Sequence, residues 1–234
     1  LILYSSSYIQ MTIQLLNQYG VSCCFEGEKI VCSNQKPHFR EEMLFTEPDY
    51  STAPSFWALS LITRKRIAVY MPADKSVQGD FRFIHVLEQL GFKKEYHVKE
   101  SRNYLEFSGQ FSEGIEISMK DMPDQVMNLA LLALFCTSPC IISDIEVLRY
   151  KESDRIENLI TELTKLNADI RYENGKLMIK PGFRVQEEVL LSSHNDHRLA
   201  MIFLILQDIC PLIKIDNTEC ICKSAPEFIA FLSI

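Results

Sequence analysis

The pattern of apolar and polar positions repeats along the chain, and its clearest copy spans residues 154–179. Five apolar residues there follow the spacing of one helix face: Ile156, Leu159, Ile160, Leu163 and Leu166. Two short apolar segments come next, separated by Glu173-Asn174-Gly175, which is typical of a hairpin turn. This stretch therefore predicts an amphipathic helix followed by two antiparallel strands.

Two further copies of the pattern occupy residues 8–32 and 81–107. Their amphipathic helices are expected to end at Gly20 and Gly91, and Asn167 takes the same place in the copy described above. Glycine, and after it asparagine, most readily adopts the left-handed conformation that ends a helix. The strands predicted after the three helices are 21–25, 29–32, 93–98, 104–107, 169–172 and 176–179.

A second kind of helix alternates with the first. Residues 55–63, 124–137 and 196–208 are apolar nearly all round, which predicts helices that are buried on every side. A short strand is expected after each of them, at 67–70, 140–142 and 212–215. The repeating unit is thus a buried helix, a strand, an amphipathic helix and two strands, which indicates an α/β protein with mixed sheets.

The repeats also divide the chain. We predict nearly complete units at 54–119 and 123–190, and a partial unit at the C-terminal end. Residues 1–46 have the pattern of the tail of another such unit. The polar and acidic stretch from Pro37 to Pro48 is the predicted linker between this tail and the rest.

Composition and charge exclude several classes of protein. With 47% hydrophobic and 24% charged residues among 234, the chain has an ordinary globular composition. Its longest apolar runs, 129–136 and 199–206, fall far short of the ~20 residues that a membrane span needs. A net charge of −7 argues against a nucleic-acid-binding protein, and the N-terminus lacks the pattern of a secretory signal. We expect neither a membrane nor a nucleic acid among the partners.

The cysteines bear on where the protein is located, and the first residues bear on whether the sequence is a fragment. Eight cysteines occur without any Cys-x-x-Cys pair, and several lie in apolar runs, so we expect reduced, structural cysteines and no zinc ribbon. Reduced cysteines favour a cytosolic protein. The chain opens on Leu1-Ile2-Leu3-Tyr4 without a methionine, which we interpret as a fragment that begins inside a fold.

Charged residues gather where several predicted helices begin. Free backbone N–H groups and the helix dipole make such positions suitable for anions. Six charged residues lie there: Lys151, Arg155, Arg198, Lys223, Asp124 and Glu152. If the units stack in parallel, these side chains converge on one site. Four cations suit a ligand with phosphate and carboxylate groups, and two carboxylates suit proton transfer.

Each of these residues also has an ordinary structural explanation. Asp124 follows a proline, as a common acid of a first helical turn does. Lys151 and Arg155, four residues apart on the expected helix, fit a solvated charged face. Arg198 precedes a buried helix and needs an acidic partner, which Asp196 could supply. The binding-site interpretation and the structural one differ in whether these side chains converge on one site.

Several stretches resemble motifs of the 5-enolpyruvylshikimate-3-phosphate synthase family, the 3-phosphoshikimate 1-carboxyvinyltransferases. Residues 148–156 are similar to its L-R-x-K-E-[ST]-D-R-[IL] stretch, and residues 195–201 to its D-H-R-x-A-M stretch. Further similar segments, in the same order along the chain, are 5–9, 47–53, 77–83, 123–124 and 223–226. The resemblance covers the C-terminal half of that family, so the chain is expected to be a C-terminal fragment of such an enzyme.

The resemblance implies a fold of two lobes, each built from three βαβαββ units in an inside-out α/β barrel, with the active site in the cleft between them. Residues 1–46 would end one lobe, and residues 47–234 would form nearly all of the other. The missing N-terminal half of the same enzyme would then be a partner of this chain, and the chain alone is expected to be inactive.

The resemblance also implies a cytoplasmic enzyme that transfers the enolpyruvyl group of phosphoenolpyruvate to the 5-hydroxyl of shikimate 3-phosphate, without a metal or organic cofactor. Asp124 would be the base at the 5-hydroxyl, and Glu152 would exchange the proton on the methylene carbon. Phosphoenolpyruvate would be held by Arg155, Arg198 and Lys223. Shikimate 3-phosphate would be held by Ser5, Tyr8, Asp124 and Lys151. His197 would lie at the same site, although such a histidine is more often simply buried.

Three alternatives stay open at this point. The sister enolpyruvyl transferase, which acts on UDP-N-acetylglucosamine, has the same fold, although residues 151–155 favour the shikimate enzyme. The chain is otherwise a non-catalytic relic or a regulatory binding lobe. A repeat scaffold for protein contacts would instead carry an exposed apolar patch and bind no anion.

Overall fold

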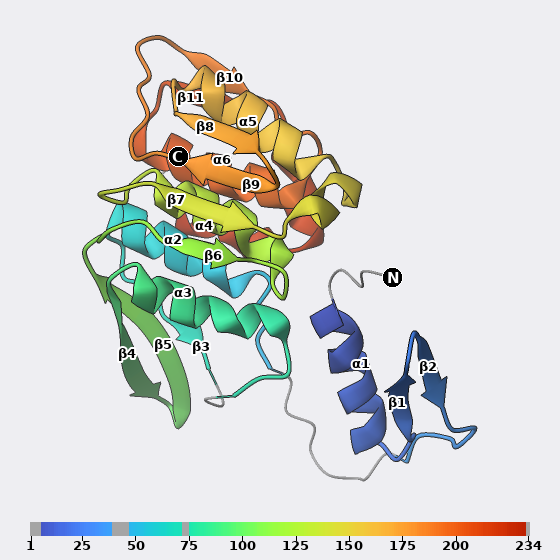
Figure 1. Ribbon diagram of the computed structural model, residues 1–234. Coiled ribbons are helices and arrows are strands. Elements are labelled where there is room, and N and C mark those ends of the chain that lie inside the picture. Colours follow the sequence, from blue (N-terminus) through green and yellow to red (C-terminus); the bar gives the residue numbers. More distant parts are fainter. Residues whose placement is uncertain (1–5, 39–46, 72–74, 233–234) are drawn as a thin grey trace.

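Helices and short strands alternate along the chain in this computed structural model, which describes residues 6–38, 47–71 and 75–232 (Figure 1). The second repeat is complete. Its elements are β6 (Glu116–Ser118), α4 (Val126–Ala133), β7 (Cys140–Ser143), α5 (Arg155–Lys165), β8 (Ile170–Glu173) and β9 (Lys176–Ile179). The strands pair in the order β6-β7-β9-β8, with β6 and β7 parallel and the other pairs antiparallel. This is the βαβαββ unit that the resemblance implied, although its first strand, β6, lies within the span 54–119 that the repeats assigned to the preceding unit.

The flanking repeats reproduce parts of this arrangement. The first comprises α2 (Ala53–Thr63), β3 (Val69–Tyr70), α3 (Phe83–Gln89), β4 (Phe92–Lys99) and β5 (Arg102–Gly109). Its sheet has the order β3-β5-β4, which corresponds to β7-β9-β8. The last comprises β10 (Val189–Leu191), α6 (His197–Ile209) and β11 (Ile213–Ile215), and its parallel strand pair corresponds to β6 and β7.

Local sequence explains the hairpins of these sheets. Asn174 and Gly175 both have positive φ and form a two-residue turn between β8 and β9. Such turns match the right-handed twist of the strands that they join. Glu173, expected in the turn, instead pairs with Lys176 as the last residue of β8. Asn167 also has positive φ and lies just after α5, as the sequence predicted.

The core lies where the three predicted buried helices pack. Helices α2, α4 and α6 contact one another and run together through the middle of the molecule (Figure 1). Every residue of α4 is buried, and so is Trp57 of α2. In contrast, α5 buries one face through side chains such as Leu159 and Leu163 and exposes the other. This packing brings the N-terminal ends of α2, α4 and α6 together, which positions the site described below.

The N-terminal segment contains α1 (Ser6–Gln18), β1 (Cys23–Glu26) and β2 (Lys29–Cys32), and it lies to one side of the other elements (Figure 1). The start of α1 contacts a short 3₁₀ helix, η1 (Gly79–Arg82). Ser7 Oγ donates a hydrogen bond to the Asp121 carbonyl at 2.7 Å. The contact is close, because a Cβ atom on Gly79 would stand 2.8 Å from Ser7.

One prediction about the cysteines is wrong. Cys23 and Cys32 form a disulfide, because the register of β1 and β2 places them directly opposite each other. Their Cα atoms are 4.1 Å apart. The other six cysteines are free. The expectation of a cytosolic setting therefore loses the support of eight reduced cysteines and stays a prediction from the resemblance.

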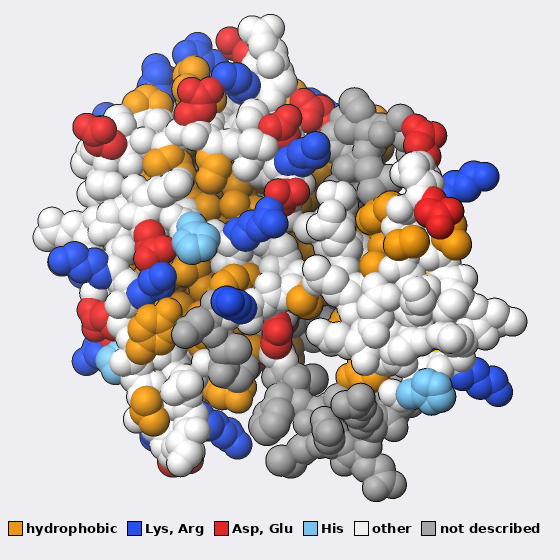
Figure 2. Space-filling view, turned by 60° about the horizontal axis from the view of Figure 1, so that its bottom comes forward, with side chains coloured by type: hydrophobic (Ala, Val, Ile, Leu, Met, Phe, Trp, Pro, Cys, Tyr) orange, Lys and Arg blue, Asp and Glu red, His pale blue; other side chains and the backbone are white. Residues whose placement is uncertain are grey.

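One face of the molecule shows a mixed distribution of charge. On the face drawn in Figure 2, Lys and Arg side chains are interspersed with Asp and Glu side chains. This distribution is unlike the basic face of a typical nucleic-acid-binding protein. None of the helices within the described ranges combines the length and the apolar character that a membrane crossing needs.

Candidate active site

Helix α5 begins at Arg155 rather than within the charged stretch before it. Asp154 caps the helix, since its carboxylate accepts a hydrogen bond from the Glu157 backbone N–H at 3.1 Å. Lys151 lies before the helix, in an extended conformation that follows the 3₁₀ helix η3 (Glu146–Tyr150). Lys151 and Arg155 therefore do not occupy one helix face, and the solvated charged face weighed from the sequence is wrong for this pair.

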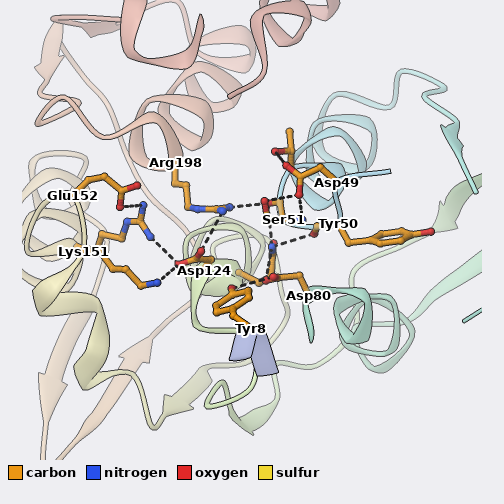
Figure 3. A network of polar contacts seen from close by, with 12 residues as sticks. Tyr8, Asp49, Tyr50, Ser51, Asp80, Asp124, Lys151, Glu152 and Arg198 are labelled. Carbon is orange, nitrogen blue, oxygen red and sulfur yellow. Dashed lines mark hydrogen bonds and ion pairs between the residues drawn. The ribbon is translucent and has the colours of Figure 1, made fainter. Parts of the chain in front are cut away.

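Asp124 lies at the centre of a polar cluster (Figure 3). Its Oδ1 accepts a hydrogen bond from Arg155 Nη1 at 2.9 Å and forms an ion pair with Lys151 Nζ at 3.2 Å. Its Oδ2 accepts a hydrogen bond from Arg198 Nη2 at 3.2 Å. Burial alone raises the pKa of Asp124, but the three cations, with Arg198 first, hold that pKa below its usual value. The carboxylate is therefore ionised at neutral pH.

The convergence predicted from the repeats is thus found for three of the four cations. Asp124 belongs to η2 (Pro123–Gln125), immediately before α4, and it is the acid of the first turn there, as its position after a proline predicted. Its contacts with three cations go beyond that ordinary explanation. Arg155 and Arg198 come from the starts of α5 and α6, so three helix starts meet at one carboxylate.

Arg155 is the most enclosed of these cations, with a side chain 0% exposed. Besides Asp124, it donates from Nε to Asp196 at 2.7 Å and from Nη2 to Glu152 at 2.7 Å. Burial disfavours the charged guanidinium, but Asp196, followed by Asp124 and Glu152, raises the pKa of Arg155. Asp196, considered above as the partner of the Arg198 guanidinium, pairs with Arg155 and caps α6 through the Arg198 backbone N–H.

Arg198 is bonded less completely. Its Nη1 donates to the Ser51 carbonyl at 2.7 Å, and its Nη2 reaches Asp124. Its Nε atom is buried and has no hydrogen-bond partner among the residues that the structure describes. The side chain is 11% exposed. A buried donor without a partner typically costs about 1–3 kcal/mol, so a ligand acceptor at this atom would be strongly favoured.

Tyr8 reaches the cluster from α1. Its hydroxyl donates a hydrogen bond to Asp80 Oδ2 at 3.0 Å, and the Lys151 ammonium lies 5.6 Å from the centre of its ring. Burial, and then the negative charges of Asp80 and Asp124, raise the pKa of Tyr8, so the phenol is neutral. The structure therefore brings Tyr8 together with Lys151 and Asp124.

The remaining predicted residues are less central. His197 is the buried first residue of α6, and burial followed by the charge of Arg198 lowers its pKa, so the imidazole is neutral at pH 7. Lys223 is exposed at the end of η4 (Glu219–Lys223), and none of the ion pairs found between described residues includes it. Ser5 lies outside the described residues.

Two buried residues of the cluster were not predicted, Asp80 and Gln125. The Gln125 side-chain amide donates to Asp80 Oδ1 at 2.9 Å and to the Ser51 carbonyl at 3.1 Å. Gln125 directly follows Asp124 at the start of a largely apolar run, which is a sequence signal for a polar group with a buried partner. Asp80 follows Gly79 within the 77–83 stretch, where only the resemblance drew attention to it.

A different group of side chains has the composition of a metal site. Ligand atoms of Glu95, His97 and Glu106 on β4 and β5 lie within 4.8 Å of one another. Glu106 is already ion-paired with Arg66. A cavity of about 390 Å³ lies beside this group, lined in part by Glu95, Glu106 and Arg66. Neither feature includes the residues that meet around Asp124.

Solved structures with the same fold are enolpyruvyl transferases. The EPSP synthase from Acinetobacter baumannii matches with a TM-score of 0.69 and 21% sequence identity, covering 92% of this chain and 52% of that one. The enolpyruvyl transferase NikO from Streptomyces tendae matches with a TM-score of 0.67 and 14% identity, covering 94% and 51%. The chain thus has the fold of these enolpyruvyl transferases.

Sequence similarity narrows this class to one family. The sequence model of EPSP synthase (3-phosphoshikimate 1-carboxyvinyltransferase) matches residues 3–232, and the chain belongs to that family. The 3-phosphoshikimate 1-carboxyvinyltransferase of Nostoc punctiforme is 34% identical over 227 residues, which are 97% of this chain and 52% of that protein. The corresponding protein of Buchnera aphidicola is 32% identical over 237 residues, covering 99% and 54%. The chain therefore spans about half the length of these relatives.

Proposed function

We propose that this chain carries the part of an active site that belongs to one lobe. The complete site would transfer the enolpyruvyl group of phosphoenolpyruvate to the 5-hydroxyl of shikimate 3-phosphate. The observation that supports this most directly is the buried Arg198 Nε, which lies beside the Asp124 carboxylate and finds no hydrogen-bond partner in the described part of the chain. A planar guanidinium with a free donor suits bidentate binding of a carboxylate or phosphate. The names of the relatives supply the substrates.

In the proposed reaction Asp124 takes the proton of the 5-hydroxyl as the hydroxyl oxygen bonds to C2 of phosphoenolpyruvate. Its lowered pKa keeps it ionised for this purpose. Glu152 gives a proton to C3, which completes a tetrahedral intermediate. Glu152 then takes a proton back from C3 while the C2–O bond to phosphate breaks and Asp124 passes its proton to the leaving phosphate. This leaves the enolpyruvyl ether and free hydrogen phosphate, with both carboxyl groups in their starting states.

The cations divide between the two substrates in this proposal. Arg198, Arg155 and Lys223 hold phosphoenolpyruvate, whereas Lys151 and Tyr8, with Ser5, hold shikimate 3-phosphate. Arg155 already donates to three carboxylates, so phosphoenolpyruvate reaches it only where one of them withdraws. Glu152, with 36% of its side chain exposed, is the most exposed of the three. The cations then stabilise the charge that develops on phosphate and carboxylate oxygens.

The other half of the site belongs to the same proposal. Because the chain spans about half the length of its relatives, we assign the remaining contacts to a region equivalent to the rest of those proteins. Residues 47–234 would form most of one lobe, and residues 1–46 the end of the other. Catalysis would then depend on the two lobes closing around both substrates.

Calorimetry and a phosphate-release assay test this function on the 234-residue chain. The chain should bind shikimate 3-phosphate and phosphoenolpyruvate but release negligible phosphate by itself. Adding the first half of the Nostoc protein as a separate polypeptide should restore release. Substantial release by the chain alone would show that other residues carry the chemistry. Binding of UDP-N-acetylglucosamine would favour the sister transferase, and binding of no anion would favour a scaffold.

A further inference from the structure

We propose that Asp80 is a positioning residue that orients both substrate-binding sides of the cluster, Tyr8 directly and Arg198 through Gln125. The inference rests on the proposed function, which assigns Tyr8 to shikimate 3-phosphate and Arg198 to phosphoenolpyruvate. Asp80 itself is 2% exposed and would touch neither substrate. Figure 3 shows it at the lower edge of the cluster, beside Tyr8 and on the far side of that residue from Lys151.

The first side of this arrangement is the contact with Tyr8. The phenol O–H donates to Asp80 Oδ2 at 3.0 Å, so the single proton of the hydroxyl is committed to that carboxylate. The Tyr8 oxygen then offers its lone pairs, rather than its proton, to a ligand. A hydroxyl group of shikimate 3-phosphate fits this acceptor, whereas a phosphate dianion does not. Asp80 would therefore determine which group of the substrate Tyr8 recognises.

The second side runs through Gln125. Its Nε2 donates to Asp80 Oδ1 at 2.9 Å and to the Ser51 carbonyl at 3.1 Å. Its Oε1 accepts a hydrogen bond from Asn128 Nδ2 at 2.9 Å, which keeps the NH₂ group turned toward Asp80. The same Ser51 carbonyl accepts the hydrogen bond from Arg198 Nη1. Asp80 thus orients the Arg198 guanidinium through the Gln125 side chain and the Ser51 carbonyl.

The chemistry at Asp80 explains why a carboxylate stands there. Two donors, a phenol and an amide NH₂, approach its two oxygens from separate directions. An asparagine has one acceptor oxygen and would turn its own NH₂ group toward one of these donors. Burial raises the pKa of Asp80, and the Gln125 hydrogen bond acts against that rise. A group that served only to fill space would not need a buried acid.

Three single variants separate the two sides: Tyr8→Phe, Gln125→Met and Asp80→Asn. Each is titrated with shikimate 3-phosphate and with phosphoenolpyruvate by calorimetry on the full chain. Tyr8→Phe should weaken the binding of shikimate 3-phosphate only, and Gln125→Met should weaken the binding of phosphoenolpyruvate only. Asp80→Asn should weaken both by about tenfold, the scale of one hydrogen bond to a charged group. In the Tyr8→Phe background, Asp80→Asn should cause no further loss for shikimate 3-phosphate.

Asp121→Asn is the matched control. It makes the same change of charge beside the start of α1, at a side chain that is 47% exposed and pairs with Arg82 outside the network. This variant should bind both substrates as the unaltered chain does. Unchanged binding of both substrates by Asp80→Asn would overturn the proposal. If Asp80→Asn does not fold, the other two single variants decide, because a loss of both substrates in each of them would also overturn it.

A readout without substrate separates this proposal from the proposed function. The nine tyrosines can be labelled with ¹³C at Cζ, and the Tyr8 signal can be assigned with Tyr8→Phe. Asp80→Asn should move the Tyr8 signal and leave the others in place. If the unaltered chain binds neither substrate, the proposed function fails. The tyrosine spectrum then decides alone, and an unmoved Tyr8 signal overturns the positioning role.

Discussion

The starts of α5 and α6 each place an arginine beside Asp124, yet the two guanidinium groups are in different situations. Arg155 is fully enclosed and donates to the carboxylates of Asp124, Glu152 and Asp196. Arg198 has one carboxylate partner, one backbone carbonyl and a buried Nε without an acceptor among the described residues. A cation whose donors are satisfied by the protein stabilises the fold, whereas an unsatisfied one is available to a ligand.

The difference shows that burial and charge alone do not separate an arginine whose donors the protein already satisfies from one that keeps a donor free for a ligand. Both side chains are largely enclosed, and both lie at helix starts, where a cation is disfavoured by the dipole. What distinguishes them is the number of carboxylates within reach. Asp196 contributes most to this, because it lies at the start of α6 yet faces Arg155 of α5.

The largest expected effect is on stability, at Arg155. Arg155→Met should lower the free energy of unfolding by about 3–5 kcal/mol, because Asp196 is then left as a buried charge without its cation. Urea denaturation monitored by circular dichroism measures this change. The matched variant Arg198→Met should lose less than half as much. Equal losses would mean that the two arginines do not differ as described.

A variant of Asp124 tests the carboxylate that Arg155 and Arg198 share. Asp124→Asn should lower the free energy of unfolding by about 2–4 kcal/mol near pH 7, because three cations lose their shared carboxylate. The folded pKa of Asp124 is below its unfolded value of about 3.9. Its contribution is therefore complete above that unfolded value and disappears as the pH falls through the folded pKa.

The measurement is a series of urea denaturation curves for both proteins between pH 7 and pH 2. The difference in unfolding free energy between the chain and Asp124→Asn should shrink as the pH approaches the lower end. A difference that stayed constant over this range would assign the loss to packing rather than to the charge of Asp124. Asp169→Asn, at an exposed pair with Lys180, is the control for a carboxylate outside the cluster.

A smaller effect is expected on ligand binding at Arg198. Arg198→Lys should weaken phosphoenolpyruvate binding by about 1.5–3 kcal/mol, because an ammonium keeps the charge but cannot donate in the bidentate geometry of a guanidinium. Titration calorimetry on the full chain provides the comparison. Arg149→Lys, at a half-buried pair with Asp154 outside the cluster, should leave the affinity unchanged. Equal affinity in the chain and in Arg198→Lys would assign Arg198 to structure.

The smallest effect concerns the exposed carboxylate of the Arg155 group. Glu152→Gln should change the free energy of unfolding by only about 0.2–1 kcal/mol, since 36% of this side chain meets solvent and exposed ion pairs contribute little. In the complemented enzyme, however, it should abolish proton exchange at C3 of phosphoenolpyruvate. Deuterium incorporation from heavy water reports that step. Normal incorporation would remove Glu152 from the proposed chemistry.

The order of elements was predictable because periodicity is a local property of sequence. The apolar stripe at 156–166 and the Asn174-Gly175 turn each specify their structure within a few residues. The copy at 154–179 placed the start of α5 correctly, but Lys151 was wrongly assigned to the same helix, although Asp154 followed three residues later by Glu157 is a recognisable capping pattern. The charged residues before it obscured that signal, because helix-forming side chains continue across the boundary.

The contacts within the site were less predictable than the set of residues that form it. Repetition of the unit placed Asp124, Arg155 and Arg198 together, but it did not indicate which carboxylate serves which cation. Asp196 and Arg155 are 41 residues apart, and their pairing depends on how α6 packs beside α5. Asp80 was missed for the same reason, since both of its partners come from other segments. Tertiary packing decides such pairings, and no local pattern encodes them.

The disulfide of the N-terminal hairpin acts mainly on the unfolded chain. Cys23 and Cys32 are nine residues apart, and closing a loop of this size removes conformational entropy worth about 3 kcal/mol from the unfolded ensemble. This restriction of the unfolded chain affects only the hairpin of β1 and β2. Among residues 6–38, Val21 and Cys23 are the buried apolar side chains, so hydrophobic burial contributes little there. Oxidation state would therefore set how firmly this hairpin is ordered, independently of the larger core.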